Sequence, residues 1–70
     1  MSLEYLEWED MAFAFDRKDR RLFLMDGDKM RELDPRTSGI FTDVTSRGTP
    51  ISKEEAMEWA EEFAENRVVR

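Results

Sequence analysis

Short apolar runs alternate with polar turns through the first half of the chain. In residues 11–16 the large side chains Met11, Phe13 and Phe15 alternate with alanines, which is the two-residue period of a strand with one buried face. Residues 21–26 read RLFLMD, an apolar run typical of a central strand covered on both faces. These runs, separated by turn residues, predict a β-meander.

Turn residues place a further strand after this pair. The sequence DGD around Gly27 predicts a hairpin turn, since glycine tolerates the positive φ that such turns require. The chain then returns over residues 29–34. Pro35 ends that strand, because proline cannot donate the next hydrogen bond of the ladder.

The pattern is weaker at the two ends of the meander. Residues 3–8 fit an alternating strand, although Leu3 and Leu6 also have the spacing of a helical turn. Residues 40–45, IFTDVT, are rich in β-branched side chains that alternate in polarity. We expect both segments to be strands, which makes the sheet four- or five-stranded.

A C-terminal helix is expected over residues 53–67. Ser52 followed by Glu55 three residues later is a capping box, which fixes the helix start. One face of this helix is apolar and carries Ala56, Met57, Trp59, Ala60, Phe63 and Ala64, with Arg67 at its end. The predicted fold is therefore α+β: an antiparallel meander with one amphipathic helix packed on it, in a single domain over residues 1–70.

The other face of the predicted helix carries six glutamates: Glu54, Glu55, Glu58, Glu61, Glu62 and Glu65. Several are spaced i, i+4, and each such like-charge pair destabilises a helix by roughly 0.2–0.5 kcal/mol. A helix selected for stability alone would interleave lysines. Two interpretations stay open: a solvated face of an acidic protein, or a surface that opposes a basic groove on a partner, including a groove that holds nucleic acid.

Composition supports a basic partner. The chain has 17 acidic and 11 basic residues and a net charge of −6, which disfavours direct binding to nucleic acid or to anionic membranes. No apolar run approaches the roughly 20 residues of a membrane span, and the start lacks the features of a signal peptide. We therefore expect a cytoplasmic protein.

A basic cluster offers one alternative. Four basic residues gather at the predicted turn between residues 16 and 21, close in sequence to Phe13, Phe15 and Phe23. Basic and aromatic side chains together can form a stacking platform for single-stranded nucleic acid. The cluster consists of Arg17, Lys18, Arg20 and Arg21. Neighbouring aspartates and the net charge argue against this use.

The apolar sheet offers another alternative. Leu22 and Leu24 point to one face of the predicted sheet, and Phe23 and Met25 point to the other. A single helix covers only one face, so Phe23 or Leu24 would form an apolar interface for a homodimer or an accessory subunit. Folding of the N-terminal strand across this face, to close a barrel-like core, is equally compatible with the sequence.

The residue types disfavour catalysis. The chain has no cysteine and no histidine, so thiolate chemistry, the usual zinc sites and the commonest general base are missing. Three glycines exclude a glycine-rich phosphate loop. A carboxylic general acid needs a desolvated pocket, for which a chain of this size has little room. We predict a protein that is not an enzyme and that has no cofactor and no metal.

The leading hypothesis is a non-catalytic protein-binding module, an inhibitor or regulator. Its candidate contact residues are Glu54, Glu58, Glu61, Glu62 and Glu65, facing a basic surface of a nucleic-acid-handling protein. In size, acidity, lack of cysteine and architecture, the chain resembles the small inhibitors that phages encode against host nucleic-acid machinery. That resemblance implies a role as a nucleic-acid mimic. No sequence motif takes part in it.

Overall fold

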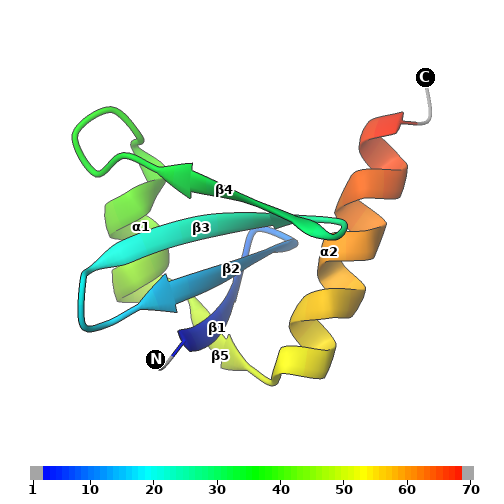
Figure 1. Cartoon of the computed structure of the whole chain (residues 1–70), viewed down its shortest axis with the longest axis horizontal. Coiled ribbons are helices and arrows are strands. Elements are labelled where there is room, and N and C mark those ends of the chain that lie inside the picture. The colour runs from blue at the N-terminus through cyan, green and yellow to red at the C-terminus, as the bar shows by residue number, and fades with distance from the viewer. Residues whose placement is uncertain (1–2, 69–70) are drawn as a thin grey trace.

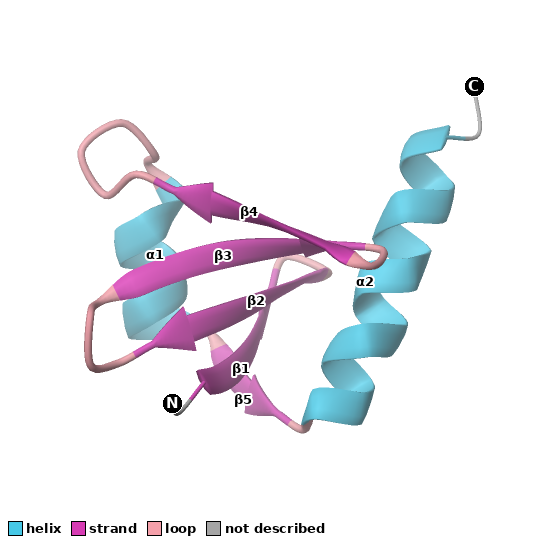
Figure 2. Ribbon diagram, viewed as in Figure 1, coloured by secondary structure: helices cyan, strands magenta, loops and turns pink. Residues whose placement is uncertain are grey.

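A computed structural model describes the backbone of residues 3–68 and the side chains of residues 3–66 (Figure 1). The chain forms five strands and two helices in this range (Figure 2). In chain order they are β1 Leu3–Trp8, β2 Met11–Asp16, β3 Arg21–Asp26, β4 Lys29–Leu33, α1 Ile40–Arg47, β5 Thr49–Ile51 and α2 Lys53–Val68.

The five strands form one antiparallel sheet in the order β4-β3-β2-β1-β5. The first four strands are a meander of three hairpins, and β5 returns after α1 to pair with the open edge of β1. Tyr5 lies opposite Ile51 on β5 and opposite Ala14 on β2. The fold is therefore α+β with the predicted meander and a C-terminal helix packed on it.

The predicted bounds of the meander and of the C-terminal helix agree closely with the structure. Strands form at residues 3–8, 11–16 and 21–26 as expected, and β4 ends at Leu33, one residue before the predicted end. The ambiguous N-terminal segment is a strand. The C-terminal helix starts at Lys53, where Glu55 N donates to Ser52 Oγ (3.1 Å) and Ser52 N donates to Glu55 Oε1 (3.4 Å). This is the capping box that the sequence predicts.

The prediction of a strand over residues 40–45 is wrong. These residues belong to α1, in which Phe41 and Val44 are buried and Thr42 is exposed. Apolar residues at 40, 41 and 44 also have helical spacing, so the segment fits either period, and as a helix it packs Phe41 and Val44 against the sheet. Thr45 Oγ1 donates to the carbonyl of Phe41 (3.0 Å), so the hydroxyl is satisfied within the helix.

The two helices cover opposite faces of the sheet, near opposite ends of the long strands (Figure 1). On one face α1 packs over Phe13, Leu22 and Leu24. On the other face α2 packs over the small side chains of β2 and over Met25. The expectation of one helix on one face is therefore corrected, because α1 covers the face that a single helix would leave open.

Small residues let α2 approach the sheet closely. Ala12 and Ala14 of β2 and Ala56 and Ala60 of α2 are all fully buried in one cluster. The turn between β3 and β4 also reaches the helix, where Gly27 N donates a hydrogen bond to the carbonyl of Ala60 (2.9 Å). The β3–β4 hairpin is thereby fastened to the middle of α2.

One member of the predicted apolar stripe is misplaced. Trp59 and Phe63 are partly buried against the two core clusters, but Met57 is 54% exposed. The side chain of Arg67, also assigned to the stripe, lies outside the described residues. The buried face of α2 is therefore narrower than the sequence indicates, and it consists mainly of alanines.

Gly27 provides a stability test. Its φ is +62°, and a Cβ added there would lie 3.3 Å from the Cβ of Ala64. We expect Gly27→Ala to lower the free energy of unfolding by about 1–2 kcal/mol, because alanine is strained in the left-handed region. Urea denaturation followed by circular dichroism measures this loss.

Gly39 is the matched control. Its φ is −67° and nothing lies within 4 Å of an added Cβ, so Gly39→Ala should change stability by no more than about 0.5 kcal/mol. Equal losses in the two variants would contradict the attribution of the loss to the left-handed conformation of Gly27.

Candidate protein-binding surface

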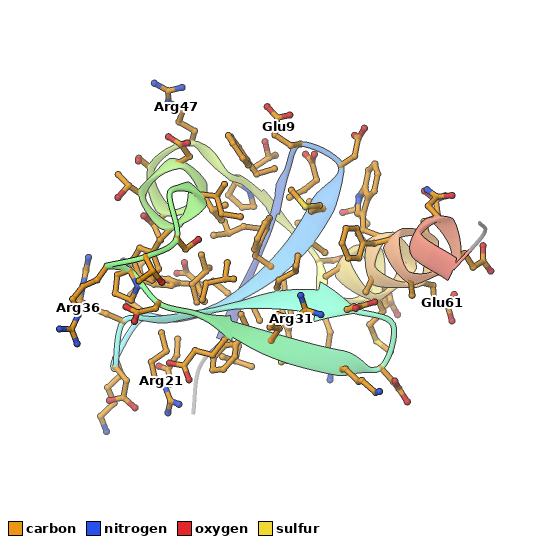
Figure 3. All side chains as sticks on the ribbon, turned by 90° about the horizontal axis from the view of Figure 1, so that it is seen from above. Glu9, Arg21, Arg31, Arg36, Arg47 and Glu61 are labelled. Carbon is orange, nitrogen blue, oxygen red and sulfur yellow. The ribbon has the colours of Figure 1, made fainter. Side chains whose placement is uncertain are left out.

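The six glutamates of α2 lie together on its exposed outer face. Figure 3 shows Glu61 pointing away from the sheet. Within the described part of the chain none of the six forms an ion pair, and only Glu55 has a hydrogen bond, to the capping residue Ser52. The structure thus brings together all five glutamates proposed as contact residues, and their charges are not neutralised by the fold.

Some acidic residues outside α2 are paired with arginines. Four ion pairs form among the described residues, and all join residues between positions 4 and 36. They are Arg17 with Glu4 (2.6 Å), Arg21 with Glu32 (2.8 Å), Arg31 with Asp26 (3.9 Å) and Arg36 with Asp34 (4.0 Å). These four arginines therefore offset carboxylates outside α2, and the carboxylates of α2 form no ion pair in the described range.

The bond between Arg21 and Glu32 is the best-formed of these pairs. The guanidinium donates from Nε (2.9 Å) and from Nη2 (2.8 Å) to the two carboxylate oxygens. These hydrogen bonds, with the attraction between the charges, lower the pKa of Glu32 and raise that of Arg21. The same guanidinium lies 5.6 Å from the ring centroid of Phe23, so Arg21 also covers part of that ring.

Two of the three aromatic rings beside the basic hairpin are buried. Phe13 is fully buried and Phe15 is 7% exposed, so neither ring is accessible to a nucleic-acid base. Two of the four basic residues, Arg17 and Arg21, are engaged by carboxylates. The other two of the four, Lys18 and Arg20, are exposed and have no ion partner among the described residues.

The two residues of the alternative apolar interface lie on opposite faces of the sheet. Leu24 is buried beneath α1, and Phe23 is half-buried on the face of α2. The exposed large apolar side chains of the described range are instead Met30 (48%) and Met57 (54%). Together with Tyr5 they line a shallow recess of about 240 Å³ between β4 and α2. The sequence did not indicate this recess, because Met57 fits the buried stripe of the helix.

A groove lies between α2 and the turn that joins β1 to β2. It has a volume of about 410 Å³, and it is lined by Glu9, Asp10 and Met11 from the turn and by Trp59, Glu62, Phe63 and Asn66 from α2. Glu9 and Asp10 both have positive φ, 55° and 63°, as a two-residue hairpin turn requires. The nitrogen of Asp10 donates to Glu7 Oε2 (3.0 Å), which holds the turn in place.

The groove was not predicted. Its two sides are about fifty residues apart in the sequence, and neither side has a motif of its own. The one available signal is a surplus of acidic residues at both ends of the chain: residues 1–16 have five acids and no base, and residues 53–70 have six acids and three bases. The groove extends the anionic surface from α2 to the β1–β2 turn, so that Glu9 and Asp10 join the predicted glutamates.

No protein-family model matches the chain, and no significant match is found among curated proteins or solved structures. The described residues include no cluster of carboxylates arranged to hold a metal ion. Neither α1 nor α2 has the length and apolar character needed to cross a bilayer. The candidate function is therefore inferred from the exposed residues and their charges alone.

The pair of Arg21 and Glu32 gives a pH prediction. Arg21→Gln should raise the pKa of Glu32 toward its ordinary value of 4.5, because the charged donors are lost. The pKa of Glu32 is lowered in the folded protein, so the pair stabilises the fold above the pKa of the unfolded chain, and this contribution disappears as the pH falls through the folded-state pKa. Carboxyl-resolved NMR titration measures the shift.

Arg17→Gln is the control for this titration, since Arg17 contacts Glu4 and not Glu32. It should leave the midpoint of Glu32 unchanged. A midpoint that also stays unchanged in Arg21→Gln would show that Arg21 does not set the pKa of Glu32.

Proposed function

We propose that this protein is a non-catalytic protein-binding module, an inhibitor or regulator, that docks on a basic surface of a nucleic-acid-handling protein in the cytoplasm. The contact residues are Glu54, Glu58, Glu61, Glu62 and Glu65. One observation carries the proposal: the fold leaves these carboxylates exposed and without ion partners in the described range, while four arginines outside α2 are paired with other acids.

The charge density of α2 supports a partner that ordinarily holds nucleic acid. Six carboxylates between residues 54 and 65 amount to about one charge per 3 Å of helix axis, given a rise of about 1.5 Å per residue. A single strand of duplex DNA carries one phosphate per roughly 3.4 Å of axis. A basic groove matched to phosphates therefore meets a similar linear density of negative charge on this helix.

Complementary charge would act mainly on the rate and the orientation of docking. An anionic face steers a cationic partner during diffusional encounter, and exposed charges at the rim add less to the final affinity. Apart from Glu9 and Asp10 of the β1–β2 turn, residues 3–52 hold nine acidic and eight basic residues, whose charges nearly cancel, so they contribute little to this steering. Binding is therefore expected to slow and weaken as salt screens the glutamates.

A second candidate function is self-association or accessory-subunit assembly through the apolar recess. The exposure of Met30 and Met57 beside Tyr5 supports it, since adjacent exposed apolar side chains mark contact sites. If this candidate holds, the wild-type chain sediments as a dimer at micromolar concentration, and Met30→Lys with Met57→Lys makes it a monomer. A strictly monomeric wild type would eliminate the homodimer.

Charge reversal on α2 tests the leading proposal. The variant E58K/E61K/E65K should fold normally, because these side chains make no contacts that the fold needs, but it should lose capture of basic proteins from a lysate of the native host. Proteins captured by the wild type should be nucleic-acid binders, and added DNA or RNA should release them.

The single variant D19K is the control, compared with E61K, which changes net charge by the same amount. Asp19 is exposed and lies in the turn between β2 and β3, at the end of the sheet away from α2 (Figure 1). Capture should survive D19K and weaken in E61K. Retention of capture in E58K/E61K/E65K would refute the proposed surface.

A further inference from the structure

The groove between the β1–β2 turn and α2 combines two chemistries in one place. Three carboxylates line it, from Glu9 and Asp10 on the turn and from Glu62 on the helix. Trp59 and Phe63 supply aromatic surface, and none of the lining residues is basic. In Figure 3 Glu9 marks the turn that forms one side of this groove.

The aromatic side chains are held firmly enough to act as walls. Trp59 packs against the cluster beneath α2, and Phe63 packs against the cluster on the other face of the sheet. Both are only partly buried, so each ring is anchored in the core and still borders the groove. Two anchored rings beside carboxylates suit a cation, which is attracted both to the ring faces and to the negative charges.

The groove is continuous with the acidic face of α2. Glu62 lines it and also lines a smaller hollow of about 230 Å³ with Glu55, Glu58 and Trp59. A partner that lies along the glutamates of α2 therefore passes over the groove. At about 410 Å³ the groove lies at the lower end of the roughly 300–1,000 Å³ range of small-ligand clefts, so it suits a side chain better than a whole element.

We propose that this groove receives one cationic side chain, arginine or lysine, of the partner protein. This inference rests on the proposed function and adds to it the position at which the partner is anchored. The side chain stacks against Trp59 and Phe63, and its charged end faces Asp10, Glu62 and Glu9. Anions are repelled by the three carboxylates, and an uncharged apolar group would leave those carboxylates without a partner.

A capped tripeptide with a central arginine is the probe, and the same peptide with citrulline is its neutral counterpart. The readout is the indole N–H signal of Trp59 in NMR spectra, with Trp8 as an internal reference, because Trp8 does not line the groove. The arginine peptide should shift Trp59 saturably and leave Trp8 unchanged. The citrulline peptide should cause no such shift, and a lysine peptide tests the second cation.

Two variants of equal charge change locate the site. D10N/E62Q removes two carboxylates of the groove and should weaken binding of the arginine peptide by about tenfold, because the guanidinium loses two nearby negative charges. E54Q/E61Q removes two carboxylates of the helix face that do not line the groove, and it should change the affinity by less than about twofold.

The proposal is overturned if the citrulline peptide shifts Trp59 as strongly as the arginine peptide does. It is also overturned if neither cationic peptide shifts Trp59, or if the two double variants weaken binding equally. Trp59→Leu provides a second test, in which peptide binding is followed through the backbone NMR signals of Glu62 and Asn66. Binding of the cationic peptide should be lost, and the circular dichroism spectrum should stay that of the wild type.

Failure of this inference can be told apart from failure of the proposed function. If D10N/E62Q leaves peptide binding unchanged while E58K/E61K/E65K abolishes capture of basic proteins, the groove is not the anchor and the acidic surface still docks. If the arginine peptide binds at Trp59 but no basic protein is captured, the groove is supported and the proposed partner class is wrong.

Discussion

Ala12 and Ala14 of β2 meet Ala56 and Ala60 of α2 with all four side chains fully buried, and this contact sets how closely the helix lies against the sheet. A chain of this length buries only about 60% of the surface of its unfolded form, so the core is thin. Larger side chains here would lift α2 away. The hydrogen bond from Gly27 to the carbonyl of Ala60 would then be lost, because it requires close approach of the turn.

The position of α2 determines the surface chemistry of the molecule. Because the alanines face the sheet, the glutamates must face outward, and because Trp59 and Phe63 flank the alanines, they reach the end of the sheet beside the β1–β2 turn. Four arginines outside α2 are meanwhile held by Glu4, Glu32 and two aspartates. Packing and charge pairing together concentrate the net negative charge of the protein on one helix and one turn.

Much of this fold follows from local sequence signals. Alternation in β2, the glycine turn before β4 and the capping box at Ser52 are short-range features, so the strands and the start of α2 could be predicted. The helix over residues 40–45 could not be predicted, because a segment so short fits both the period of a strand and the period of a helix. Its helix is favoured by the need to cover Leu22 and Leu24, which is a tertiary requirement.

The candidate site divides in the same way. The glutamate face of α2 follows from helical periodicity, so its residues could be listed before the structure was known. The groove required the β1–β2 turn to lie beside α2, and no local pattern encodes that contact. Met57 was misplaced for a related reason: it fits the stripe on a helical wheel, but α2 contacts the sheet mainly through its alanines, and the narrow contact leaves Met57 outside.

The distribution of glutamates along α2 bears on whether folding alone explains them. Glu54 and Glu55 lie in the first turn, where the positive end of the helix dipole stabilises carboxylates. Glu65 lies in the last turn, where the dipole disfavours a negative charge, and Glu58 and Glu62 repel each other across one turn. The capping box and the buried alanines stabilise the helix despite these terms. The carboxylates in its second half therefore destabilise the helix in the free protein. Positive charge on a bound partner would make their contribution to the free energy favourable.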